Sequence, residues 1–137
     1  MNVSAEYVKN VNGILMIATH FGAIYYIFEA VSARLEPRDQ VALIMILSPL
    51  TAAFVSLFLK DLIKHQSPDT RQHLTFTATF AGVTVLLTIL YGSTLFFMLH
   101  NFLKNQDVTA EILKTYVGVI ETVIGGFVGL VYGELYK

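Results

Sequence analysis

Four long, almost uncharged segments constrain this chain more than any other feature of its sequence. They cover residues 11–30, 41–60, 74–99 and 115–134, with boundaries good to a few positions. Each segment has the roughly 20 residues that a helix needs to cross a hydrocarbon core about 30 Å thick. A helix also satisfies its own backbone hydrogen bonds, as a lipid environment requires. The sequence therefore predicts an all-α integral membrane protein, a single domain over 1–137 built as a bundle of four transmembrane helices.

Composition supports the membrane assignment and argues against several kinds of functional site. Hydrophobic residues make up 55% of the chain and charged residues 14%, whereas soluble domains carry about 25% charged residues. The chain has no cysteine, which excludes disulfides, thiolate metal sites and cysteine nucleophiles. It also lacks the Gly-x-Ser-x-Gly, Walker and His-Glu-x-x-His motifs, and its histidines do not have metal-ligand spacing. We expect neither an enzyme nor a cofactor or metal site.

From Thr115 to Gly133 the last segment carries one charge, the carboxylate of Glu121, inside an otherwise uncharged run. A charge at such depth is costly and commonly faces a pore or cavity. Glycines spaced by four residues, together with positions three or four residues before them, share one helix face with Glu121. In a homo-oligomer this face would form a ring of carboxylates around an axis. The predicted pore lining is Lys114, Gly118, Glu121, Gly125 and Gly129.

A structural reading of the same face is equally open. Glu121 can hydrogen-bond to a neighbouring helix and fix the register, while the glycines allow close packing within one subunit. His20, near the middle of the first segment, is a candidate partner of Glu121 or a proton sensor.

Basic residues gather where the second and third helices are expected to extend beyond the membrane. The second helix can reach about His65, and the third can begin at Pro68 with Ser67 as its N-cap. Lysine and arginine recognise phosphates, so this projecting hairpin is where an anionic ligand would bind. The alternative is that the same charges anchor the chain at lipid headgroups. The predicted ligand-binding residues are Lys60, Lys64 and Arg71.

The charges give a weak indication of orientation. Five basic residues lie on the side that holds both termini and four on the other side. The positive-inside rule then favours cytoplasmic termini, in a membrane that we expect to be a bacterial inner membrane. Such balance also fits dual topology, in which the chain inserts into the membrane in both orientations.

At the start of the last helix, Asp107 is placed to act as an N-cap.

Two short motifs carry a resemblance to a known family. They are Ser48–Ala53, in the second segment, and Ile124–Gly129, in the fourth. With short loops over the whole chain, they resemble the small multi-spanning effectors of bacterial anti-phage defence, among them the channel subunit of the Hailong system. The resemblance implies a homo-oligomeric pore that depolarises the infected cell. It also implies control by an anionic nucleotide or oligonucleotide ligand or a regulatory protein, and it assigns no residues.

Three functions compete at this point. The first is a homo-oligomeric ion-conducting pore in the lipid bilayer, lined by the last helix. The second is a small dual-topology, proton-coupled exporter that uses membrane carboxylates such as Glu121 or Glu29. The third is a non-conducting accessory subunit of a larger membrane complex.

Overall fold

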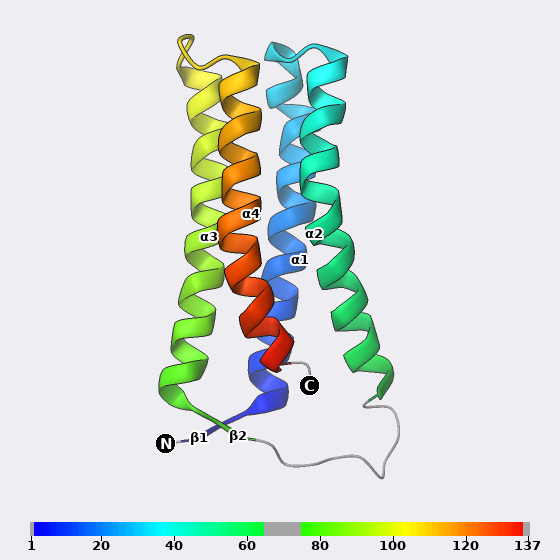
Figure 1. Ribbon diagram of the computed structural model, residues 1–137, viewed down its shortest axis with the longest axis vertical. Helices are drawn as coiled ribbons and strands as arrows, with labels where there is room; N and C mark the ends of the chain where they lie inside the picture. The colour runs from blue at the N-terminus through cyan, green and yellow to red at the C-terminus, as the bar shows by residue number, and fades with distance from the viewer. Residues whose placement is uncertain (1, 65–74, 136–137) are drawn as a thin grey trace.

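A computed structural model describes residues 2–64 and 75–135, apart from the side chains at positions 64, 124, 127, 128 and 132–135. Four long helices run up and down in antiparallel order (Figure 1). Their bounds are α1 (Ala5–Glu29), α2 (Pro37–Lys64), α3 (Ala78–Lys104) and α4 (Ala110–Leu135). A short 3-10 helix, η1 (Val31–Arg34), joins α1 to α2. The structure is therefore consistent with the predicted all-α membrane protein.

The helices pack as the four corners of a square. Helix α1 contacts α2 and α3, and α4 contacts the same two helices, so α1 and α4 face each other across a diagonal. Buried residues on α1 follow helical steps of three and four, as in Met16, His20, Ala23 and Ile27. The core is continuous along the bundle, with fully buried Leu43, Leu47, Leu95 and Leu99 among its members.

Among the residues that the structure describes, three helices are long and apolar enough to cross a membrane. They are α1, α2 up to Ile63, and α3. Large hydrophobic side chains also cover the outside of the bundle, with Phe21, Met45 and Phe97 each more than half exposed. Water would not favour such a surface, but lipid does. The chain thus has the character of a membrane protein, and the crossing of α4 stays a prediction.

Two short strands, absent from the sequence prediction, lie at one end of the bundle. Strand β1 (Asn2–Ser4) pairs antiparallel with β2 (Thr75–Thr77), with Val3 opposite Phe76. Helix α3 begins directly after Thr77, whose hydroxyl accepts a hydrogen bond from the backbone amide of Phe80 at 3.2 Å. The prediction that the third helix runs unbroken from Pro68 is wrong, because residues 75–77 are extended and paired. The predicted cap Ser67 lies outside the described residues.

Two other boundaries differ from the prediction. Helix α1 starts at Ala5, because Ala5, Val8 and Asn12 extend its buried stripe toward the N-terminus. Asp107 does not cap α4; the hydroxyl of Thr109 accepts from the amide of Ile112 at 3.3 Å instead. The N-terminal end of α1 and the C-terminal end of α4 lie at the same end of the bundle (Figure 1).

Candidate functional site

Several polar side chains of this bundle are buried inside it, while large apolar side chains cover much of its outside. Buried polar side chains occur on all four helices. All of them hydrogen-bond or pair with a side chain of another helix, except Thr84, whose hydroxyl donates to the Phe80 carbonyl of its own helix. In a membrane, ionisable groups turned into the bundle mark candidate functional positions. The buried polar and charged residues are Lys9, Asn12, His20, Asp61, Thr84, Thr88 and Glu121.

Three of these helices meet through a central cluster of His20 on α1, Tyr91 on α3 and Glu121 on α4. The Tyr91 hydroxyl donates a short hydrogen bond to Oε1 of Glu121. It also lies 2.9 Å from Nε2 of His20, and the other ring nitrogen of His20 lies 2.9 Å from the carbonyl oxygen of Met16. Nε2 of His20 is 3.8 Å from Oε2 of Glu121. The structure therefore confirms His20 as a partner of Glu121 and adds Tyr91 as the bridge.

Helix α2 closes the central cluster with an aromatic ring. The rings of Phe54 and His20 have centroids 5.7 Å apart, and those of Tyr91 and His20 are stacked at 5.5 Å. Because His20 and Tyr91 have no exposed surface, the centre of one subunit is filled with side chains at this level.

A second polar layer lies next to the central cluster, toward the N-terminal end of α1. The Thr88 hydroxyl donates to Oδ1 of Asn12 at 3.0 Å, and Nδ2 of Asn12 donates to the Val8 carbonyl at 2.9 Å. One turn further on, the Lys9 ammonium pairs with Asp61 of α2 at 3.1 Å, and both side chains are nearly buried. Polar contacts thus run inside the bundle from Lys9 to Glu121.

The five predicted pore-lining residues do not share one outward face. Glu121 and Gly125 are turned into their own bundle, and a Cβ atom at Gly125 would lie 2.6 Å from Leu50 of α2. At Gly118 and Gly129 an added Cβ would meet nothing within 4 Å. Positions three or four residues apart drift around a helix, so one stripe passes from the buried side to the outer side. Glu121 makes a hydrogen bond to a neighbouring helix of its own subunit, the contact that the structural reading requires.

Lys114, the first of the five, lies at the opposite end of the bundle from the Lys9–Asp61 pair. Its ammonium donates to Glu111 at 2.7 Å and to Asp39 of α2 at 2.9 Å. These two hydrogen bonds raise the pKa of Lys114 above its ordinary value, and the bond to Glu111 has the larger effect. Lys114 therefore ties the start of α4 to the start of α2.

The outer side of α4 carries a strip of small residues that we call the small face. At Gly126, as at Gly118 and Gly129, an added Cβ would meet nothing within 4 Å. The hydroxyls of Thr115 and Thr122 donate to backbone carbonyls of their own helix. The sequence reasoning missed both threonines, although they follow the same steps of three and four. The small face consists of Thr115, Gly118, Thr122, Gly126 and Gly129, of which Gly118 is half-buried and the others are exposed.

Of the predicted ligand-binding residues, the structure describes one side chain. Lys60 is exposed on α2. The side chain of Lys64 and the whole of Arg71 lie outside the described residues, as do His65 and Pro68 of the expected hairpin.

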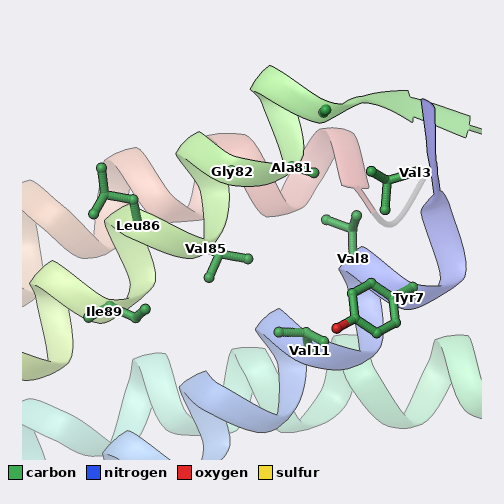
Figure 2. A pocket seen from close by; sticks show the side chains of 10 residues that line it. Val3, Tyr7, Val8, Val11, Ala81, Gly82, Val85, Leu86 and Ile89 are labelled. Atoms are coloured by element: carbon green, nitrogen blue, oxygen red, sulfur yellow. The ribbon is translucent and has the colours of Figure 1, made fainter. Parts of the chain in front are cut away.

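An apolar groove of about 480 Å³ lies between α1 and α3, near β1 (Figure 2). Tyr7 and Val11 line it from α1, and Val85 and Ile89 from α3. Apart from the Tyr7 hydroxyl, the side chains that line it are hydrocarbon. The groove has no groups for acid–base or metal chemistry and suits an apolar occupant.

Comparison of the chain with protein families, curated proteins and solved structures found no match.

Proposed function

We propose that copies of this protein assemble in a membrane into a homo-oligomeric ion-conducting pore, with α4 of each copy at the shared axis. The observation that carries the proposal is the division of the outer side of α4 into two sectors. One sector is the small face, and the other holds the large side chains Ile112, Tyr116, Val119, Val123 and Leu130. Large apolar side chains suit lipid, whereas small residues on a membrane helix let another helix backbone approach closely.

Conduction between copies agrees with the filled centre of one subunit. Tyr91, His20 and Phe54 occupy the middle of the bundle, so a path for ions has to be enclosed by several copies. Cyclic symmetry builds such a path from a single exposed face. The hydroxyls of Thr115 and Thr122 and the backbone at the glycines would then supply the polar lining.

The proposal includes a membrane crossing by α4. The helix has 26 residues and is about 39 Å long, which exceeds a hydrocarbon core of about 30 Å. Four crossings place both termini on one side of the membrane, in agreement with the common end at which α1 begins and α4 finishes (Figure 1). The cytoplasmic side of a bacterial inner membrane remains our expectation for that end.

The family resemblance extends the proposal to a gated effector of anti-phage defence. Exposed Lys60 lies on α2 at the end of the bundle that holds the termini, where a cation can meet an anionic ligand. We propose a nucleotide-derived ligand there, with Lys64 and Arg71 as its further contacts.

Ion flux into proteoliposomes tests the pore. Gly126→Leu places a large side chain on the small face, and Gly82→Leu is the matched control, because an added Cβ at Gly82 on α3 also meets nothing. We expect Gly126→Leu to abolish ion flux and weaken the oligomer, and Gly82→Leu to leave both unchanged. An intact wild-type oligomer that passes no ions with or without nucleotide ligands would refute the proposal.

A second candidate, the proton-coupled exporter, is favoured by one observation, the buried cluster of His20, Tyr91 and Glu121. Carboxylates and histidines inside a bundle are typical of proton relays in transporters. This candidate requires substrate efflux that stops when the proton gradient is collapsed. In a dual-topology dimer, cysteines placed at exposed Arg38 and exposed Lys60 would each be labelled from both sides of the membrane. Labelling of each from one side only would exclude dual topology.

A further inference from the structure

The hydrogen bonds of the central cluster need one hydrogen more than neutral His20, Tyr91 and an ionised Glu121 possess. Three contacts link the Met16 carbonyl to Nδ1 of His20, Nε2 of His20 to the Tyr91 hydroxyl, and that hydroxyl to Glu121. Each contact requires one hydrogen. The carbonyl supplies none, the hydroxyl supplies one, and a neutral imidazole supplies one. With Glu121 ionised as well, one contact would lack its hydrogen.

We infer that His20, Tyr91 and Glu121 form a binding site for one dissociable proton inside the bundle. Two arrangements satisfy all three contacts. In the first, His20 is a cation and donates from both nitrogens, while Tyr91 donates to the Glu121 carboxylate. In the second, neutral His20 accepts from Tyr91, and a protonated Glu121 donates to the Tyr91 oxygen. The two differ by a shift of hydrogens through the Tyr91 hydroxyl, and both leave the cluster without net charge.

The far oxygen of Glu121 supports this assignment independently. Oε2 is buried and has no hydrogen-bond partner among the residues that the structure describes. An ionised carboxylate with one such oxygen is costly in a site of low polarity, unless a cation lies close by or the group takes up a proton. Nε2 of His20 lies 3.8 Å from this oxygen, so a proton on either His20 or Glu121 supplies one of these remedies.

The groups that face the cluster leave few other sources for that proton. Helix α1 contributes His20, α3 contributes Tyr91 and α4 contributes Glu121, while α2 contributes the ring of Phe54. Among the described residues, the next ionisable pair, Lys9 and Asp61, lies beyond the layer of Asn12 and Thr88. Lys9 and Asp61 pair with each other at 3.1 Å.

Release of the proton to water changes how α4 is held. The cluster becomes an anion. When neutral His20 keeps its hydrogen on Nδ1 and donates it to the Met16 carbonyl, Tyr91 has a single hydrogen for two acceptors, Nε2 of His20 and the Glu121 oxygen. One of the contacts that connect α4 through Tyr91 to α1 is then lost, so α4 loosens from the bundle. This inference goes beyond the proposed pore and holds whether or not the copies conduct ions.

NMR of the full chain in micelles over a range of pH, with nitrogen-labelled histidine and carboxyl-carbon-labelled glutamate, tests the proton directly. We expect one pH step in which the His20 ring and the Glu121 carboxyl change together, as coupled groups do. His100, which is exposed and lies 3.3 Å from the Tyr26 hydroxyl, serves as the reference ring and should not share that step.

The variant Glu121→Gln makes the expectation sharper. A glutamine amide donates to the Tyr91 oxygen, so neutral His20 satisfies every contact without an extra proton. We expect the variant to lose the step and hold His20 as the neutral Nδ1–H form. The matched control Glu111→Gln, an exposed carboxylate on the same helix, should keep the step. Wild-type protein with neutral His20 and ionised Glu121 throughout, or a step that survives Glu121→Gln, would overturn the inference.

Cysteine labelling below and above the pH step tests the loosening of α4. Val117→Cys places the probe on the buried side of α4. Val119→Cys, on the exposed side of the same helix, is the reference that corrects for the pH dependence of the thiol. Above the step, we expect the labelling rate at 117 relative to 119 to rise at least about tenfold, as the loss of a buried hydrogen bond allows. A ratio that stays constant through the step would contradict the loosening.

Discussion

Nε2 of His20 on α1 and Oε2 of Glu121 on α4 lie 3.8 Å apart, across the diagonal of the four-helix bundle. The helices that carry them have few direct contacts, because α2 and α3 lie between them. The Tyr91 hydroxyl bridges the pair, and its contacts with both are buried. A carboxylate that would be costly in lipid is thus held inside one subunit.

Tyr91→Phe removes the bridge and nothing else from the ring. The change leaves two buried polar groups, on His20 and Glu121, without their shared partner. We expect the free energy of unfolding to fall by about 1–3 kcal/mol. Thermal or denaturant unfolding in detergent measures the loss. Tyr116→Phe, on the half-exposed outer side of α4, is the control and should have no effect. Equal stability of the two variants would contradict the bridge.

Thr88→Val tests the second polar layer at constant side-chain shape. It deletes the hydroxyl that lies 3.0 Å from both Oδ1 of Asn12 and the Thr84 carbonyl oxygen, so the link between α3 and α1 loses its hydrogen bond to Asn12. The expected loss of stability is about 1 kcal/mol. The comparison is Thr94→Val, whose hydroxyl donates to the Leu90 carbonyl of its own helix. If both variants unfold alike, the contact with Asn12 contributes nothing.

Gly92→Ala tests the close approach of α1 and α3. An added Cβ would lie 3.0 Å from Oγ1 and 3.2 Å from Cγ2 of Thr19, a β-branched side chain with few alternative rotamers. Gly82→Ala gains the same helix propensity in open space. We expect Gly92→Ala to be less stable than Gly82→Ala by about 1–3 kcal/mol, the usual cost of overpacking. Thermal unfolding of the two variants gives the difference, and no difference would mean that the helices are further apart.

Lys114→Met tests the contact between the starts of α4 and α2 through its pH dependence. Hydrogen bonds to Glu111 and then Asp39 raise the pKa of Lys114 in the folded protein. A raised pKa of a cation stabilises the fold below the ordinary value, about 10.4, and this contribution is lost as the pH rises through the folded value. The melting temperature of the wild type should therefore exceed that of Lys114→Met at neutral pH, and the gap should close in strong alkali. A gap that does not depend on pH would show that packing, and not charge, is responsible.

The helices could be predicted from the sequence because each is a long apolar run, whereas His20 could be predicted only as one candidate partner of Glu121. The strands could not be predicted, since three residues are too few for a periodic signal. The predicted start of the third helix, at Pro68, was wrong for the same reason. Only the contact of Thr75–Thr77 with the N-terminal residues fixes it.

Which side of α4 faces the bundle could not be predicted from the sequence. In a soluble helix, polarity separates the buried face from the exposed one, but in a membrane helix both faces are apolar. Gly125 and Gly126 are neighbours with the same side chain. Yet an added Cβ at Gly125 would meet Leu50, whereas one at Gly126 would meet nothing within 4 Å. Only the packing of α4 against α2 and α3 decides which glycines remain outside.

Cysteine cross-linking between copies tests the central claim, that the small face of α4 lies at a shared axis. The chain has no cysteine of its own, so Thr122→Cys on the small face and Val83→Cys on the exposed side of α3 are clean single probes. We predict that oxidation in native membranes links Thr122→Cys into a species of about twice the 15.3 kDa chain mass and leaves Val83→Cys monomeric. Efficient linkage through Val83→Cys, with Thr122→Cys remaining monomeric, would contradict the account.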